Sequence, residues 1–321
     1  MGLWRIDADT LASSRFVVSA LAEATATLMA LATASAPHPG QRAWLDHHLP
    51  AYRERLATDP VTALLVTAQL GSHWIPDYLT PTPSGEADPD FYDELAQIRD
   101  TPAEVAQADL VVALGRPLPD QLNRRDLPER SADLLDWVWT HAVLPSWKSR
   151  RQVLEADVVA RTRQLSRGGW AAALDDIRPG TRWLGGGRLQ INAYDYPPRE
   201  ISGAQLLLVP VTPRQGWASW AEPHRYALVY PCSGVLAGLN LSPAAGALAR
   251  LLGAGRAAVL LRLDTPKSTT QLVALTGQGL GSVGRHLKVL LEARLIERRR
   301  AGRSVLYYRT STGDVLVQAQ D

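Results

Sequence analysis

Residues 268–309 are STTQLVALTGQGLGSVGRHLKVLLEARLIERRRAGRSVLYYR, and this stretch decides which fold the sequence predicts. Ser268 and Gln271 have the spacing of a capping box, in which the serine side chain accepts a hydrogen bond from the backbone N–H three residues on and the glutamine reaches back to the cap. A short helix is therefore expected from Ser268 to Thr276. Gly277 lies just past its last turn, where a residue with positive φ ends a helix at little cost.

An amphipathic helix is expected next, with Gly279 as its N-cap and its end near Arg294. The gap between the two helices is only a few residues, which suits the tight turn of a helix-turn-helix. The apolar residues of this helix recur at helical spacing and should face inward: Leu280, Val283, Leu287, Leu290 and Leu291. Its polar residues lie opposite them or on the flank: Ser282, Arg285, His286 and Lys288. Such side chains donate hydrogen bonds to bases and phosphates, so this is the candidate recognition helix for a DNA groove.

Two short strands are expected after this helix, Leu295–Arg300 and Ser304–Thr310, joined by Ala301-Gly302-Arg303. Four arginines crowd the tip of the hairpin: Arg298, Arg299, Arg300 and Arg303. Such a tip suits the phosphate backbone of a nucleic acid. An arginine run can also be a charged edge that deters edge-to-edge strand pairing, but its place after a helix-turn-helix favours the DNA contact. The order of elements predicts a winged helix-turn-helix.

From about Ala244 to Arg309 the chain resembles the ArsR/SmtB-type winged-helix transcriptional regulators. The strongest agreement is Ser282-Val283-Gly284-Arg285-His286-Leu287-Lys288-Val289-Leu290, followed by Leu295-Ile296-Glu297 and a Gly-Arg wing that ends in Tyr307-Tyr308. Two positions depart from the family: Gly284 stands where it usually has serine, and Arg294 where it usually has glycine. The first departure removes a phosphate or base contact. The second places a cation at the C-terminal turn of the helix, where it suits the helix dipole.

The resemblance implies a sequence-specific DNA-binding transcriptional regulator of the ArsR family. It would be a dimeric repressor that reads a palindromic operator in double-stranded DNA through helix 280–294 and the wing 298–303. The family dimerises through helices that flank its winged helix, to which Ala244–Leu252 would contribute. Many members sense metals through cysteines on the helix before the recognition helix. This chain has Gln271-Leu272-Val273-Ala274-Leu275 there, so we expect no metal sensing at that helix.

Two glycine patterns suggest phosphate binding only at first sight. Gly279-x-Gly281-x-x-Gly284 spells the dinucleotide-binding fingerprint, which needs a strand before it and an acidic residue about twenty positions later. Here a helix precedes the pattern, and the position about twenty residues after Gly284 lies near Ser304, which is not acidic. Gly185-Gly186-Gly187 lacks the Lys-Ser/Thr of a phosphate loop and is expected to be a turn. We therefore expect no cofactor.

Length and charge indicate two domains of different character. The chain has 321 residues, enough for about two cores, and a formal net charge of +2. From Ala244 onward it carries 12 Lys or Arg against 5 Asp or Glu, a net +7, and the preceding residues carry 22 against 27, a net −5. A basic C-terminal unit behind an acidic body is typical of a polyanion-binding module joined to a sensing or assembly domain.

Composition also bears on the compartment. No apolar run approaches the roughly 20 residues that span a bilayer, and the N-terminus lacks the pattern of a secretion signal. We expect a cytoplasmic protein with no membrane partner. Cys232 is the only cysteine, so no internal disulfide can form, and a buried, inert thiol is expected.

The first 240 residues are expected to form a mostly helical domain with a small sheet. Helical patterns cover Thr10–Thr33, Gln41–Ala57, Asp59–Leu70, Phe91–Arg99, Pro102–Leu114, Ser131–Val143 and Ser146–Ser166. Strand-length runs occur at residues 3–6, 189–193, 205–211 and 225–230. We predict an α+β fold. Residues 1–240 would be a regulatory or assembly domain, helical to about residue 180 with a small antiparallel sheet at about 181–235. Residues 244–321 would be the winged helix-turn-helix DNA-binding domain.

These 240 residues also resemble an uncharacterised actinobacterial domain that is often fused ahead of such winged helices. The residues that carry this second resemblance are Arg15-Phe16-Val17-Val18-Ser19, Glu155-Ala156-Asp157-Val158-Val159-Ala160-Arg161, Leu165 and Gly168-Gly169. It implies a regulator with a large N-terminal domain of unknown ligand, and it supplies no catalytic residues.

Two further groups of residues are candidates for binding. Trp217, Trp220, Tyr226 and Tyr230 would line a pocket for an apolar small-molecule effector, since aromatic walls with polar tips are common in ligand sites, although packing of the sheet explains them equally well. Asp46-His47-His48 has residue types that bind zinc. Adjacent histidines on a helix diverge by about 100°, so a polar helix surface is favoured there and no metal site is expected.

The sequence also bears on catalysis. No serine or cysteine stands in a recognisable nucleophile elbow with a base, so we expect that the chain is not an enzyme. Two alternatives remain open. One is an enzyme with a catalytic N-terminal domain tethered to a winged helix, and the other is a winged-helix protein-interaction module, which has no need of an arginine cluster.

Overall fold

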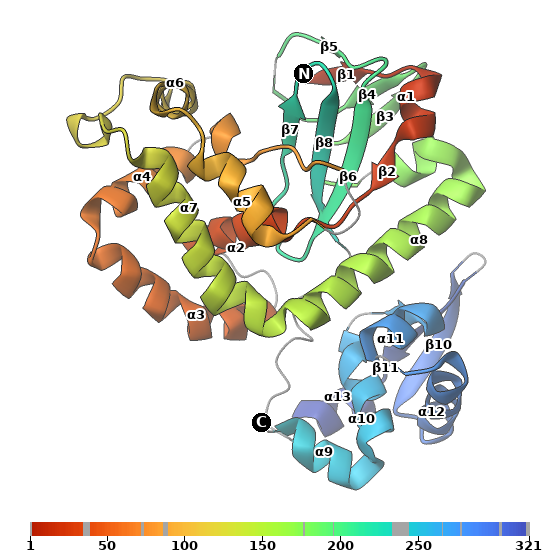
Figure 1. Ribbon diagram of the computed structural model, residues 1–321. Coiled ribbons are helices and arrows are strands. Elements are labelled where there is room, and N and C mark those ends of the chain that lie inside the picture. The colour runs from red at the N-terminus through yellow and green to blue at the C-terminus, as the bar shows by residue number, and fades with distance from the viewer. Residues whose placement is uncertain are drawn as a thin grey trace. The chain divides into compact units, whose positions relative to one another are not determined.

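A computed structural model describes residues 2–34, 39–71, 74–85, 89–175, 177–194, 196–232, 244–264, 266–276, 278–301 and 304–318. The chain divides into two compact units, one formed by residues 1–37 and 42–234 and the other by residues 38–41 and 235–321. In Figure 1 the second unit takes the blue end of the colour scale. Both units combine helices with strands, so the fold class is α+β, as predicted.

The helices of the first unit are α1 (Ala8–Ser13), α2 (Ala20–Thr33), α3 (Pro39–Ala57), α4 (Pro60–Leu70), α5 (Phe91–Arg99), α6 (Ala103–Leu114), α7 (Leu127–Val138) and α8 (Trp147–Leu174). Those from α2 to α7 form a helical layer, whereas α1 and the end of α8 pack against the sheets. Helix α2 is buried along almost its whole length, because α4, α5 and α7 pack around it. It therefore forms the centre of the helical core.

The helix predicted over Thr10–Thr33 is wrong as a single element. Strand β2 (Arg15–Phe16) separates α1 from α2. Helix α2 begins after Ser19, whose side chain accepts a hydrogen bond from the N–H of Ala22 at 2.9 Å. A serine cap of this kind satisfies the free N–H groups of a new helix start, and the apolar periodicity alone did not reveal it.

Strands form the rest of the first unit. They are β1 (Leu3–Arg5), β2, β3 (Arg182–Gly185), β4 (Arg188–Gln190), β5 (Arg199–Glu200), β6 (Gln205–Val211), β7 (Ala218–Ala221) and β8 (Arg225–Pro231). One four-stranded sheet has the order β3-β4-β1-β5, and the other has the order β2-β6-β8-β7. Gly185, Gly186 and Gly187 all have positive φ and form the turn between β3 and β4, as predicted.

The small antiparallel sheet predicted at about 181–235 is a second correction. Both sheets are mixed, since β2, β6 and β8 run parallel while β7 runs antiparallel to β8, and strands from the first sixteen residues belong to both sheets. The unbroken apolar run of β6 has a physical reason. Leu206 and Leu208 pack into one core cluster, and Leu207 and Val209 pack into another on the opposite face. Strands covered on both faces are typical of parallel pairing.

A buried ion pair joins the helical layer to this sheet. Glu23 of α2 and Arg150 of α8 are both fully buried, and Arg150 Nη1 lies 2.5 Å from Glu23 Oε1. Thr212, directly after β6, donates its N–H to Glu23 Oε2 at 2.8 Å. Arg150 also donates to Ser146 Oγ and to the carbonyl of Ala142. The polar groups of the pair are thus matched by neighbours from several segments.

The second unit is small. Its elements are α9 (Ala244–Leu252), α10 (Ala254–Leu261), β9 (Lys267–Ser268), α11 (Thr269–Thr276), α12 (Leu280–Glu292), β10 (Ile296–Ala301), β11 (Ser304–Arg309) and α13 (Ser311–Gln318). The strands form an antiparallel sheet in the order β10-β11-β9. Its core contains Leu260, Leu272, Leu287 and Ile296, contributed by α10, α11, α12 and β10.

Within the described ranges, no helix combines the length and apolarity that a bilayer crossing requires. Cys232, which follows β8, is buried.

The carboxyl group of Glu94 gives the first unit a pH-dependent stability. Glu94 on α5 is buried, and its Oε2 accepts hydrogen bonds from Ser19 Oγ at 2.9 Å and from the N–H of Leu21 at 3.1 Å, at the start of α2. Burial raises the pKa of Glu94 to about 7, although the two hydrogen bonds oppose the shift. The folded state therefore holds this proton to a higher pH than the unfolded chain does.

We predict that Glu94→Gln flattens this pH dependence. In the wild type, the contribution of protonated Glu94 to the free energy of unfolding is complete below pH 4.5 and is lost as pH rises through about 7. Glutamine keeps both hydrogen bonds and stays neutral at every pH. At pH 8 the variant should be more stable by about 3 kcal/mol. Urea unfolding followed by tryptophan fluorescence measures this, because all ten tryptophans lie before residue 235. The exposed Glu104→Gln is the control, and equal pH profiles for wild type and Glu94→Gln would contradict the assignment.

Candidate nucleic-acid interface

The capping box predicted at the start of α11 is confirmed. The N–H of Gln271 donates to Ser268 Oγ at 3.3 Å, and the N–H of Ser268 donates to Gln271 Oε1 at 2.8 Å. Helix α12 follows with Gly279 as its N-cap, as predicted. Gly277, expected to end α11, lies outside the described residues. Helices α11 and α12 therefore begin where their cap residues indicate.

Helix α12 turns one face to the core and leaves the other exposed. Val283, Leu287 and Leu290 are buried, as the apolar spacing predicts, and Leu291 is half-buried. Leu280 was expected on this face, but it is 62% exposed in the first turn of α12. Arg285 and Lys288 are exposed on the outer face together with Gly281 and Gly284.

His286 and Ser282 lie on the flank of α12 that faces α10. A Cβ atom built on Gly255 of α10 would come within 2.5 Å of His286 Nε2, so the imidazole lies directly against that glycine. Ser282 Oγ lies 3.3 Å from His286 Nε2. Burial, with help from the charges of Arg256 and Arg285, lowers the pKa of His286. A neutral imidazole packed against α10 positions the helix, and it leaves Arg285 and Lys288 as the outward donors.

The hairpin of β10 and β11 separates its arginines between two faces. Strand alternation places Arg298 and Arg300 on the face of buried Ile296, beyond the edge of the core, and Arg299 on the opposite face. All three are exposed. The Arg299 guanidinium lies 5.4 Å from the centre of the Tyr308 ring. Arg303, at the expected tip, lies outside the described residues.

The charges of this surface are weakly compensated. Lys288 Nζ lies 3.9 Å from Glu292 Oε1, with both side chains mostly exposed, so this pair contributes little. Within the described ranges no carboxylate lies within 4 Å of Arg285, Arg298 or Arg300. Exposed arginines with free hydrogen-bond donors are the side chains that bind phosphates and the acceptor edges of bases.

After helix α12, Arg294 adopts a left-handed conformation. Arg294 has a φ of 56°, the left-handed conformation that glycine adopts most easily. Its N–H donates to the carbonyl of Leu291 at 3.0 Å, and the N–H of Leu295 donates to the carbonyl of Leu290 at 3.0 Å. These two bonds and the apolar packing of Leu290 with Leu295 form a Schellman motif. The chain passes from α12 into β10 through this residue.

The four aromatic effector candidates do not form one wall. Tyr226 and Tyr230 are buried in the core: Tyr230 donates its hydroxyl to Asp157 Oδ2 at 2.9 Å, and Tyr226 packs edge-on to Trp4 at 5.5 Å. Trp217 and Trp220 line a cavity of about 670 Å³ in the first unit. Sequence reasoning missed the other aromatic residues of that cavity, which are Trp4, Trp74, Tyr194 and Tyr196. No local pattern connects segments so far apart in the chain.

The segment Asp46-His47-His48 lies on α3. His48 is half-buried with its ring 4.8 Å from that of Trp44, and burial lowers its pKa to about 4, with smaller contributions from His47 and Arg150. Among the residues that the structure describes, no three of the His, Cys, Asp and Glu side chains form a group that could hold a metal ion.

Comparison of the chain with protein-family models, with curated proteins and with solved structures finds no match.

We predict that Arg294→Gly stabilises the second unit. Glycine adopts the left-handed conformation without the steric cost of about 1 kcal/mol that other residues incur. Amide hydrogen exchange of residues 283–292 in the full chain should slow about fivefold, if these amides exchange through opening of this unit. Ala293→Gly is the matched control, since Ala293 has a φ of −75° and gains nothing from glycine. Faster exchange in both variants would contradict the role assigned to Arg294.

Proposed function

We propose that this protein is a sequence-specific DNA-binding transcriptional regulator, acting as a dimeric repressor, and that its second unit is a winged helix-turn-helix. The observation that carries the proposal is one small unit in which Arg285 and Lys288 on α12 and three arginines on β10 are exposed. The residues from Ala244 onward carry a net +7, while the preceding residues carry −5. A polyanion is the partner that this charge distribution favours.

The outer face of α12 suits entry into a groove. Gly281 and Gly284 are exposed, and apart from the adjacent residues and the backbone of α12 no atom of the described residues lies within 4 Å of the position that a Cβ would take on either. The backbone beside Arg285 is therefore bare, and glycine lets a backbone approach a ligand closely. In this proposal Arg285 contacts base edges, while Arg298, Arg299 and Arg300 contact phosphates.

Two copies would read a palindromic operator. Two-fold symmetry would place the two α12 helices one DNA turn apart, about 34 Å, so that each reads one half-site. Each copy contributes the same cations, which gives the dimer twice the phosphate contacts of a single unit.

We predict that Arg285→Ala and Arg300→Ala have different effects. Arg285→Ala should cost about 1 to 3 kcal/mol on a duplex enriched by in vitro selection and much less on its scrambled version, because a base contact specifies sequence. Arg300→Ala should weaken both duplexes alike and flatten the slope of log affinity against log salt by about one. Fluorescence anisotropy with labelled duplexes over a series of salt concentrations measures both effects.

The exposed Arg167→Ala on α8 controls for the loss of one positive charge elsewhere, and circular dichroism checks that each variant is folded. If Arg285→Ala weakened both duplexes equally, Arg285 would be a phosphate contact. If wild type enriched no duplex and bound random DNA no better than Arg300→Ala does, the DNA-binding proposal would be rejected, which would favour an interaction module.

We also predict that zinc and arsenite leave DNA affinity unchanged, since α11 carries Gln271-Leu272-Val273-Ala274-Leu275 and no cysteine. Titration of the protein–duplex complex with each metal, against EDTA as control, tests this. A metal-dependent release of DNA would mean that ligands lie elsewhere, and Asp46-His47-His48 would be examined first.

A further inference from the structure

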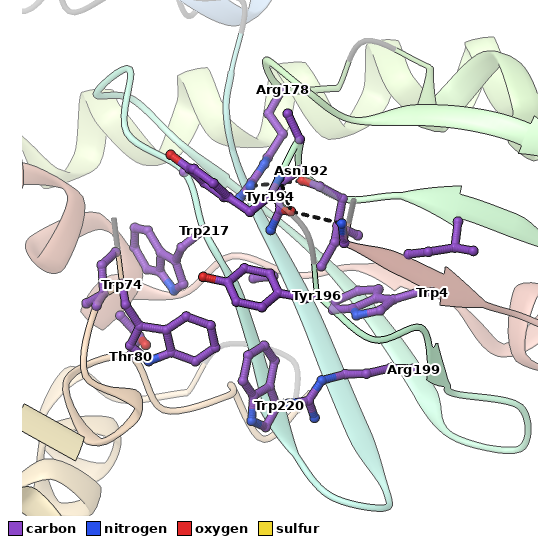
Figure 2. A pocket seen from close by; sticks show the side chains of 18 of the residues that line it. Trp4, Trp74, Thr80, Arg178, Asn192, Tyr194, Tyr196, Arg199, Trp217 and Trp220 are labelled. Carbon is purple, nitrogen blue, oxygen red and sulfur yellow. Dashed lines mark hydrogen bonds between the residues drawn. The ribbon is translucent and has the colours of Figure 1, made fainter. Parts of the chain in front are cut away.

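The cavity of about 670 Å³ in the first unit has the size of a small-molecule site. Its walls come from the N-terminal strand, the loop before Asp77, the segment Arg178–Arg199 and strand β7. Figure 2 shows the aromatic side chains of Trp4, Trp74, Tyr196, Trp217 and Trp220 around it. The walls thus combine large flat aromatic surfaces with polar side chains, among them Thr80, Arg178 and Asn192.

The aromatic rings form a connected surface. Ring centres are separated by 5.5 Å for Trp74 and Tyr196, by 5.7 Å for Trp74 and Trp220, and by 6.2 Å for Tyr194 and Tyr196. Aromatic pairs at such distances leave faces and edges on which a further ring can stack. A planar, mostly apolar ligand body fits this surface.

The charged side chains that the structure describes around the cavity leave one cation without an ion-pair partner. Arg199 is paired with Glu222, and its guanidinium lies 4.0 Å from the centre of the Trp220 ring. Asp77, the only acidic residue that lines the cavity among the described residues, is also attracted to Arg199. Burial, with help from the charge of Asp109, raises the pKa of Asp77 to about 6. Among the described residues, no carboxylate forms an ion pair with Arg178.

Arg178 is half-buried and donates Nη2 to the carbonyl of Ile191 at 3.0 Å. Its Nη1 has no hydrogen-bond partner among the described residues, and the same holds for Nε1 of Trp4, which also lines the cavity. Burial lowers the pKa of Arg178 to about 10, so the guanidinium stays charged at neutral pH. Both unmatched groups are hydrogen-bond donors, and an unmatched buried donor is costly. A ligand that accepts hydrogen bonds would satisfy these two donors.

We propose that this cavity binds a planar aromatic carboxylate, with the carboxylate on the guanidinium of Arg178 and the ring against Trp74, Tyr196 and Trp220. A carboxylate matches the planar guanidinium with parallel hydrogen bonds. Because Arg178 Nη1 is itself shielded from solvent, seating the anion needs a small shift of the side chains that cover it. The proposal deepens the effector role considered for Trp217 and Trp220, and it is independent of DNA binding.

An aromatic wall can also bind an organic cation, and the charges decide between the two ligands. Cation–π recognition places a cation over a ring face, and neighbouring positive charges oppose it. Here Arg199 already lies over one face of Trp220, and the described lining residues include two arginines against one aspartate. The electrostatic field of these side chains therefore attracts an anion and repels a cation.

The test is isothermal titration of the full chain with benzoate, 1-naphthoate and indole-3-acetate, each compared with its uncharged primary amide. We expect at least one acid to bind with a Kd below about 1 mM, and its amide to bind at least tenfold more weakly, since a hydrogen bond to a charged group is lost. Arg178→Gln should lower the affinity for the acid by a similar factor and leave that for the amide unchanged. Tyr196→Leu should weaken both.

The exposed Arg182→Gln on β3 is the matched control and should bind as wild type does. Three outcomes would overturn the proposal: no acid binds, the acid and its amide bind equally to wild type, or tetramethylammonium binds more tightly than every acid. The comparison of acid with amide on wild type holds even if Arg178→Gln fails to fold. Since no DNA is present, failure here leaves the DNA-binding proposal untouched.

Discussion

The first unit depends on the buried pair of Glu23 and Arg150. Two charges without solvent contact are stable only when every remaining donor and acceptor is matched. The matching groups here come from Ala142 and Ser146, which lie between α7 and α8, and from Thr212, directly after β6. Loss of one partner would leave a buried charge, at a cost of about 3 to 5 kcal/mol. The pair therefore fixes the helical layer against the sheet that carries β7, and Trp217 and Trp220 of the cavity lie just before and on that strand.

The second unit is organised differently, by contacts between neighbours in the sequence. Its turns are closed by local bonds: the capping box of Ser268 with Gln271, and the Schellman bonds that end at Leu295. Such bonds depend on residues a few positions apart, so the elements 269–276, 280–292 and 296–309 could be predicted from the sequence with small errors at their ends. Leu280 was placed wrongly because helical periodicity gives the face of a residue but not whether a neighbouring segment covers that face at its position.

In the first unit, sequence patterns predicted the elements better than they predicted the contacts between them. Periodicity located most helices and the strands β6 and β8, but parallel pairing depends on which segments meet across the fold, and the sequence pattern does not encode that directly. The same limit applies to the cavity. Arg178 and Trp74 are a hundred residues apart, and each resembles an ordinary core or surface residue until the chain brings them to one wall. The aromatic residues between positions 217 and 230 therefore predicted the cavity lining only in part. Trp217 and Trp220 line the cavity, whereas Tyr226 and Tyr230 do not.

If both proposals hold, thermodynamic linkage restricts how the two units can communicate. A carboxylate bound in the first unit changes DNA affinity only if it binds more tightly to one of two states that differ in DNA affinity. The effect is reciprocal, so DNA must change the affinity for the carboxylate by the same factor. A ligand that binds tightly yet equally to both states would stabilise the first unit and regulate nothing. Ligand affinity measured with and without the duplex therefore distinguishes an effector site from a cavity that only stabilises the fold.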